Sequence, residues 1–363
     1  MGVRVLKTTT RLSDGRELIY FDTGARPGRD AADPRDLAPV RPETELRYDP
    51  LQRAWIMYNA QRQDRSYLPS TADCPLCPST RSRQSEIPAS DYEVVVFENR
   101  FPALAAGLAA AREPTSELLP ARPGAGRCEV ICFTSDHDAS FADLSPDRVR
   151  LVTAALVDRT AELSKLPGVE QVYCFENRGR EIGVTQPHPH GQIYACPFVT
   201  PRTSRMLSSA RAYARRTGRN LFDDLVAAER AAGTRIVRAG RHWVAFVPHA
   251  ARWPYEVHLY PVRRVPDLAG LQPPELDELA VFQLDLLGRL ARLFSAPAPY
   301  ISAWHQAPAR SVRREFALHL ELFTLRRADD KMKFLAGAES GMDAFASDIL
   351  PERAAERLRG LSS

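Results

Sequence analysis

Cysteine is scarce in this chain, and long apolar runs are absent. Only six of its 363 residues are cysteines, too few for a disulfide framework in a protein of this length. No run of about 18 apolar residues occurs, so we expect no membrane-spanning segment. The first residues also lack the apolar stretch of a secretory signal. These absences favour a cytoplasmic protein whose thiols are reduced.

An excess of one charge sign is also lacking. The chain has 49 Lys and Arg residues against 45 Asp and Glu residues, a net charge of +4. This balance argues against a dedicated nucleic-acid-binding protein, although it permits a local basic pocket for a phosphorylated small molecule. Hydrophobic residues make up 44% of the chain, enough for a sizeable core, and the length predicts two domains or one duplicated domain.

Local patterns predict a mixed α and β protein. Strands are predicted where β-branched and aromatic residues lie between turn-forming residues, at 93–98, 128–133 and 171–176, with a hairpin at 11–21. Helices are predicted where apolar residues recur at helical spacing, at 145–164, 205–232 and 274–294, with a short one after Pro351. Proline- and glycine-rich composition predicts an extended arm at 24–44 and a loop at 105–127.

The two halves of the chain repeat one another. Residues 128–152 and 255–279 each read as a strand, a loop, Asp-Leu and a proline-initiated helix, and two further strand patterns follow in each half. We therefore predict an α+β fold with a duplicated unit of roughly 120 residues, antiparallel sheets forming a half-barrel and helices packed outside. The expected division is 1–45 (hairpin and arm), 46–200 (first half) and 201–363 (second half).

The segment His-Pro-His-Gly-Gln is the sharpest candidate for chemistry. In an extended strand, alternate side chains share a face, so His188, His190 and Gln192 point the same way. A neutral imidazole can serve as a metal ligand, a general base or a nucleophile at phosphorus. The alternative is a pair of structural histidines, but two prolines and a glycine constrain this backbone and favour a functional site.

A Cys-x-x-Cys pair, Cys74 and Cys77, is the second candidate. Two thiolates at this spacing can share one zinc ion, which needs two further ligands. His137 and His188 are the candidates for them. The alternatives are two free buried cysteines or a redox pair, and the latter is disfavoured because no β–α pattern starts a helix at Cys77.

Several motifs together resemble the galactose-1-phosphate uridylyltransferase family of the histidine-triad superfamily. They run in order from about Arg47 to the C-terminus: CPLC, TSDHDASFADL, FENRGREIGVTQP, HPHGQ, WPYEVHLYP, AWHQAP and KFLAGAESGM. The resemblance implies two histidine-triad-like halves and transfer of UMP from UDP-glucose to galactose 1-phosphate. It also implies a ping-pong reaction in which His190 carries the uridylyl group and Gln192 donates to the phosphoryl oxygens.

The resemblance further implies a set of binding residues and a homodimer. Two arginines, Arg62 and Arg65, would reach the diphosphate across the dimer interface. Uridine would be held by Phe97, Asn99 and Phe101, phosphate by Asn177 and Thr185, and the hexose by Lys333 and Glu339. A structural zinc ion would be bound by Cys74, Cys77, His137 and His188.

One part of the chain departs from the family. Some members bind a second metal through one Glu and three His. His305 and His319 match two of these histidines, and Glu321 stands at the position of the third histidine. The position of the expected Glu falls near Met206. Two possibilities therefore stay open for His305, His319 and Glu321. They bind a second divalent metal, iron or zinc, or the two histidines are only hydrogen-bonded inside the second half. In the repeat, Glu321 is expected to take the place of His190, so one active site per chain is predicted.

Two other functions stay open from the sequence. One is a related histidine-triad nucleotidyltransferase or phosphorylase that uses an adenine nucleotide or another sugar 1-phosphate. The other is a zinc-stabilised nucleotide-binding protein without turnover. The expected partners are UDP-glucose, galactose 1-phosphate and a second copy of the chain, with no nucleic acid or membrane.

Overall fold

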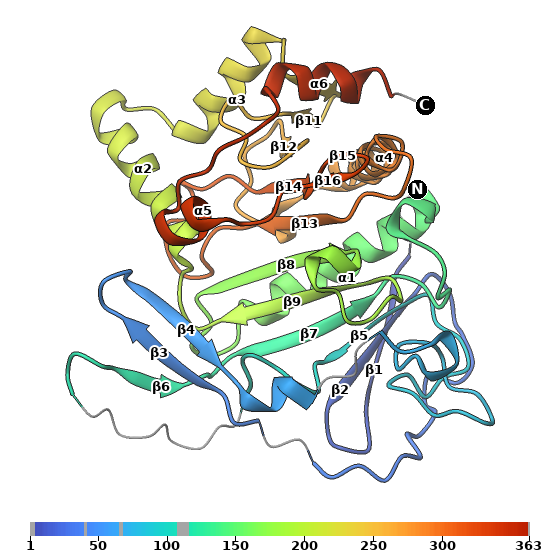
Figure 1. Cartoon of the computed structure of the whole chain (residues 1–363). Coiled ribbons are helices and arrows are strands. Elements are labelled where there is room, and N and C mark those ends of the chain that lie inside the picture. The colour runs from blue at the N-terminus through green and yellow to red at the C-terminus, as the bar shows by residue number, and fades with distance from the viewer. Residues whose placement is uncertain (1–3, 40–41, 65–67, 107–115, 362–363) are drawn as a thin grey trace.

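A computed structural model describes residues 4–39, 42–64, 68–106 and 116–361. In these ranges one open, antiparallel sheet of 11 strands extends through both halves of the chain (Figure 1). The first half supplies β1 (Leu6–Arg11), β2 (Glu17–Asp22), β5 (Val94–Glu98), β7 (Arg127–Cys132), β8 (Gln171–Arg178) and β9 (His190–Cys196). The second half supplies β10 (Ile236–Ala239), β11 (Trp243–Phe246), β12 (Val257–Pro261), β13 (Tyr300–His305) and β14 (His319–Thr324).

The strand order repeats outward from the centre of the sheet. From β8 the order is β9, β7, β5 and β2, and from the adjacent β13 it is β14, β12, β11 and β10. The predicted duplication and antiparallel pairing are therefore confirmed, with the two halves joined edge to edge through β8 and β13. The domain boundaries predicted at 45 and 200 stay a proposal.

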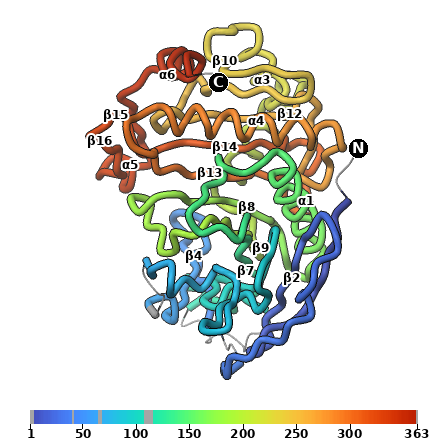
Figure 2. The backbone as a smooth tube through the Cα atoms, turned by 90° about the vertical axis from the view of Figure 1, so that its right-hand side faces the viewer, coloured from blue at the N-terminus to red at the C-terminus, as the bar shows by residue number. Residues whose placement is uncertain are grey.

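Helices cover one face of this sheet. In Figure 2, α1 (Pro146–Leu163) and α4 (Pro273–Ala291) lie across it. Their apolar side chains pack on alternate residues of the strands, such as Ile193 and Leu320, in one large core. The remaining helices are α2 (Pro201–Thr217), α3 (Leu221–Ala232), α5 (Gly337–Met342) and α6 (Pro351–Arg359). The opposite face of the sheet is left for the functional side chains.

Local sequence explains most element boundaries. The first hairpin turns at Gly15, whose φ of +87° favours glycine. Helix α1 begins after Ser145, whose hydroxyl accepts a hydrogen bond from the Arg148 amide at 3.2 Å, with Pro146 at the first helical position. The 205–232 pattern is two helices because Gly218 adopts a left-handed conformation, φ +70°, after α2.

The predicted loop at 105–127 is partly wrong. Residues 107–115 lie outside the described ranges, but Ala121–Pro123 forms β6, which pairs with β3 (Glu45–Asp49). Together with β4 (Ala54–Tyr58) these strands form a small separate sheet that projects from the first half in Figure 1. A second small sheet pairs β15 (Arg326–Ala328) with β16 (Lys331–Met332). Within the described ranges, every helix is too short or too polar to cross a bilayer.

A buried carboxyl group at the junction of the two halves predicts a pH effect on stability. Glu176 on β8 accepts a hydrogen bond from the Tyr300 hydroxyl on β13 at 2.8 Å, and burial raises its pKa from 4.5 to about 7. A carboxyl with a raised pKa in the folded state destabilises the fold as pH rises from 4.5 through about 7. We expect Glu176→Gln to remove this loss and to raise the free energy of unfolding at pH 8 by up to about 3 kcal/mol.

Urea unfolding of both proteins between pH 4.5 and 8 measures this difference. The exposed Glu162 on α1 supplies the matched control, because Glu162→Gln should show no such rise. A difference between Glu176→Gln and the native chain that does not change with pH would contradict the assignment.

Candidate active site and metal centre

Strand β9 presents His190 and Gln192 on the sheet face opposite α1 and α4. Its alternate residues, Ile193 and Ala195, belong to the helix-covered core. Gly191 lies on the crowded side, where a Cβ atom would meet the Phe133 ring and the Phe175 carbonyl oxygen at 3.0 Å. Only glycine fits there without displacement, so the glycine lets β9 approach its neighbours while both polar side chains face outward.

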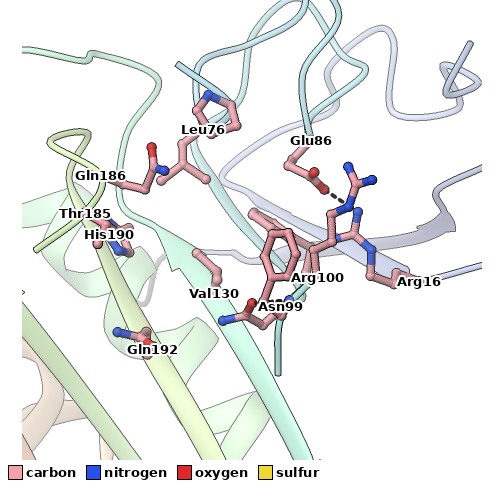
Figure 3. A pocket seen from close by; sticks show the side chains of 13 residues that line it. Arg16, Leu76, Glu86, Asn99, Arg100, Val130, Thr185, Gln186, His190 and Gln192 are labelled. Carbon is pink, nitrogen blue, oxygen red and sulfur yellow. Dashed lines mark hydrogen bonds and ion pairs between the residues drawn. The ribbon is translucent and has the colours of Figure 1, made fainter. Parts of the chain in front are cut away.

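A cavity of about 440 Å³ opens beside these two side chains. Figure 3 shows His190, Gln192, Thr185 and Gln186 on one side and Arg16, Glu86 and Arg100 on the other. The cavity is also lined by Pro75, Leu76, Phe97, Asn99, Phe101 and Val130. Apolar walls with a few convergent polar groups are typical of a site for a small organic ligand.

The His190 ring is held in one tautomer. Its Nδ1 lies 2.8 Å from the backbone oxygen of His188, and because a carbonyl oxygen can only accept, Nδ1 carries the proton. The lone pair is therefore on Nε2. Burial lowers the pKa of His190 below its usual value, so the ring is neutral at pH 7. A neutral, oriented imidazole in a ligand-sized cavity is suited to nucleophilic or general-base chemistry.

The four predicted zinc ligands come together beside this strand. The ligand atoms of Cys74, Cys77, His137 and His188 all lie within 4.8 Å of one another. The Cys77 sulfur is 3.4 Å from His137 Nδ1 and 3.5 Å from His188 Nδ1. Tetrahedral zinc with ordinary Zn–S and Zn–N bonds would separate a sulfur and a nitrogen ligand by about 3.6 Å. The donor set and its spacing therefore fit a tetrahedral metal ion.

The outer nitrogen of His188 is fixed by two oxygen atoms. Its Nε2 is 2.9 Å from the Thr134 carbonyl oxygen and 2.7 Å from the Tyr92 hydroxyl, which donates its own proton to the Leu76 carbonyl oxygen. Nε2 therefore carries a proton, and Nδ1 is left free to bind a metal. Tyr92 therefore links Leu76, between the two cysteines, to His188, two residues before β9 begins.

The structure brings five of the ten predicted substrate-binding residues to the cavity. Phe97, Asn99, Phe101 and Thr185 line it together with His190 and Gln192. Asn177, on β8, is not among the residues that line it. Arg62 lies in the short helix η1 (Ala60–Asp64) with its guanidinium 3.5 Å from the Phe101 carbonyl oxygen, whereas Arg65 lies outside the described residues.

Lys333 and Glu339 are paired away from the cavity. The lysine Nζ lies 3.0 Å from a Glu339 carboxylate oxygen and also contacts the Ala346 carbonyl oxygen, and both side chains are buried. The structure therefore brings these two residues together. Neither is among the residues that line the cavity beside His190. Their contact with a hexose stays a prediction.

Sequence reasoning missed the basic and acidic groups at the far side of the cavity. Arg16 follows the Asp14–Gly15 turn and bonds both Asp14 and Glu86, and Arg100 follows Asn99. Glu86 also accepts from Arg35 at 3.0 Å. Nothing local marks Arg16 or Glu86, because they are 70 residues apart in the chain. Arg100 could have been found, since it lies between two predicted nucleoside contacts.

The second predicted cluster also forms, but its match to the first half differs from expectation. His305, His319 and Glu321 place their ligand atoms within 4.8 Å of one another. His319 is the first residue of β14, as His190 is of β9, and its Nδ1 bonds the Ala317 carbonyl oxygen, two residues earlier, at 2.9 Å. The counterpart of His190 is therefore His319. The prediction that Glu321 takes this place is wrong by two positions, and Glu321 matches Gln192.

Comparisons with known proteins agree along nearly the whole chain. The family models for the N-terminal and C-terminal domains of galactose-1-phosphate uridyl transferase match residues 37–200 and 206–363. The galactose-1-phosphate uridylyltransferase of Streptomyces lividans is 50% identical over 97% of this chain and 97% of its own length. That of Thermotoga maritima is 34% identical over 87% of this chain and 98% of its own.

Solved structures show the same architecture. A structure described as a uridylyltransferase superposes with a TM-score of 0.77 at 30% identity, covering 87% of this chain and 98% of that one. An ADP-glucose phosphorylase from Arabidopsis thaliana superposes with a TM-score of 0.67 at 20% identity, covering 87% of this chain and 98% of that one, and shows similarity of fold alone.

Proposed function

Because the chain belongs to the galactose-1-phosphate uridylyltransferase family, we propose that it transfers a uridylyl group from UDP-glucose to galactose 1-phosphate through a covalent adduct on His190. The observation that carries this proposal is the orientation of His190. Its Nδ1 is held by the His188 carbonyl oxygen, and the ring lines a cavity large enough for a nucleotide.

The first step would form a bond from His190 Nε2 to the α-phosphorus of UDP-glucose. The bond from that phosphorus to the bridging oxygen breaks, and glucose 1-phosphate leaves with the electron pair. The ring then carries a positive charge, which the hydrogen bond from Nδ1 to the His188 carbonyl oxygen stabilises. In the second step a phosphate oxygen of galactose 1-phosphate attacks the same phosphorus, the P–N bond breaks, and UDP-galactose leaves with neutral His190 restored.

The surrounding residues would bind and orient the nucleotide. Gln192 shares the sheet face of His190, and its amide would donate to the non-bridging phosphoryl oxygens. Phe97 and Phe101 supply apolar walls for uridine, with Asn99 between them in the chain. Asn177 and Thr185 stay as proposed phosphate contacts. Arg100 adds positive charge to the lining that suits a diphosphate, whereas the charge of Arg16 is compensated by Asp14 and Glu86.

We assign zinc to the site formed by Cys74, Cys77, His137 and His188. When bound, the ion would crosslink the loop that carries the cysteines to the strand that carries His190. The chain's own residues support this role, because Tyr92 and Thr134 already fix the outer nitrogen of His188.

A homodimer would account for the exposed apolar side of the small β3–β4–β6 sheet. Ile56 and Tyr58, alternate residues of β4 that share one face of the strand, are 45% and 48% exposed. Arg62 follows directly in the chain, so a second copy covering β4 would bring this arginine toward a partner's site. Sedimentation analysis should give twice the chain mass, and Ile56→Arg, on the proposed contact face, should shift it toward the monomer.

Mass spectrometry of the His190 peptide tests the proposed function. After incubation with UDP-glucose and digestion without acid, we expect this peptide to gain the mass of one uridylyl group. ADP-glucose in a parallel reaction should give no adduct, which distinguishes the adenine-nucleotide alternative. Absence of any adduct, together with absence of label exchange between UDP-glucose and glucose 1-phosphate, would contradict the proposal.

A further inference from the structure

The second half of the chain contains a cluster that has the donor atoms for a cation. The Glu321 carboxylate lies 3.4 Å from His305 Nε2 and 3.5 Å from His319 Nε2. His258 Nε2 is 3.7 Å from the same carboxylate and 2.8 Å from Glu256. Imidazole and carboxylate groups in this arrangement can bind a divalent metal ion.

A guanidinium group already occupies the open side of this carboxylate. Arg202 donates from a single nitrogen, Nη2, to Glu321 Oε1 at 2.8 Å and Oε2 at 2.6 Å. One nitrogen shared between both carboxylate oxygens lies where a metal ion bound by that carboxylate would lie. A divalent ion held by both carboxylate oxygens would need the lone pairs that Arg202 uses, and its charge would lie against the guanidinium charge, so Arg202 strongly disfavours a metal ion there.

The position of Arg202 in its helix is otherwise unfavourable. It lies in the first turn of α2, which contains no acidic residue, and a cation at this end opposes the helix dipole. Its Nε atom is also buried without a hydrogen-bond partner among the described residues. The pairing with Glu321 therefore accounts for a placement that local helix energetics disfavour.

The matched position in the first half shows what this pairing changes. Gln192, the counterpart of Glu321, is neutral and faces an open cavity. Glu321 instead is 1% exposed and is enclosed by three imidazoles and one guanidinium. The second half thus holds a compact set of ion pairs where the first half holds a ligand cavity.

We propose that Arg202 is the resident cation of this cluster, and that the second half of this chain binds no second divalent metal ion while Arg202 is in place. This differs from the two-metal members that the sequence resembles. The inference concerns metal stoichiometry alone, so it stands or falls separately from the proposed transfer reaction.

Metal counting on the full chain tests the proposal. Proteins are equilibrated with zinc in the presence of a competing chelator, and zinc per chain is measured by elemental analysis. The native chain should hold one zinc, and Arg202→Met should hold two. The double variant with Arg202→Met and Glu321→Gln should return to one. Arg205→Met is the matched control on the same helix, because Arg205 pairs with Asp343 outside the cluster; it should hold one zinc.

Two outcomes would overturn the proposal. One is a native chain that holds two zinc ions, which requires no variant to fold. The other is a folded Arg202→Met chain, checked by circular dichroism, that still holds one. If Arg202→Met does not fold, Arg202→Gln keeps a polar group of similar length and is judged by the same counts.

Discussion

Replacing His190 with alanine is expected to lower the turnover of UDP-glucose by at least about four orders of magnitude. The reason is that the proposed reaction passes through a bond to His190 Nε2, and among the described residues that line the cavity there is no second histidine to take its place. Because the side chain is only partly buried at the edge of a cavity, the variant should fold normally. Label exchange between UDP-glucose and glucose 1-phosphate measures the effect without a second sugar.

The duplicated fold supplies a matched control for this experiment. His319 begins the equivalent strand and makes the same Nδ1 hydrogen bond to a backbone oxygen two residues earlier, but it lies in the cluster around Glu321. His319→Gln should therefore keep the exchange reaction wherever it folds. Equal loss in both variants, with both folded, would show that His190 acts through structure and not as the nucleophile.

Replacing Cys77 with alanine is expected to release the metal and to destabilise the first half strongly. Structural zinc contributes on the order of 10 kcal/mol of apparent binding free energy in small domains, and part of it is coupled to folding. We expect the free energy of unfolding to fall by at least about 3 kcal/mol, with zinc lost from the purified chain. Thermal unfolding with and without a chelator, together with elemental analysis, measures both effects.

Cys196→Ala is the control for the loss of a buried thiol. Cys196 is as buried as Cys77 but lies at the end of β9, outside the metal cluster. It should keep its zinc and lose no more than about 1–2 kcal/mol through the smaller side chain. A chelator that lowers the melting temperature of Cys77→Ala as much as that of the native chain would contradict the assignment of this cysteine as a ligand.

Several element boundaries could be predicted because their local signals are strong. The Asp14–Gly15 turn, the Ser145–Pro146 start of α1 and the Gly218 break after α2 each encode an element boundary within a few residues. Strand β6 could not, because Ala121–Pro123 has no strand pattern of its own. It is a strand only because β3 offers backbone partners to it.

The sites divide in the same way. His190 and Gln192 are alternate residues of β9, so their common face follows from strand geometry. His188 lies before β9 and is buried at the metal cluster, so strand geometry alone does not place it. Arg16 and Glu86 meet across the cavity only after folding, and Arg202 reaches Glu321 from a different helix, 119 residues away. The wrong match of Glu321 to His190 has a related origin. Aligning two repeats by sequence alone can be shifted by two residues, because such a shift keeps every side chain on the same face of the strand. The shared hydrogen bond of His190 and His319 resolves it.

The joining of both halves in one sheet, with β8 beside β13, has an evolutionary consequence. In a dimer of two identical single-unit chains, every substitution would appear in both subunits, so the two units could not differ. A covalent tandem escapes that constraint, so one copy can keep its reactive ring while the other loses its ligand space and becomes scaffold. Gln192 and Glu321 show this difference within a single polypeptide: the first faces the ligand cavity, and the second is buried in a set of ion pairs.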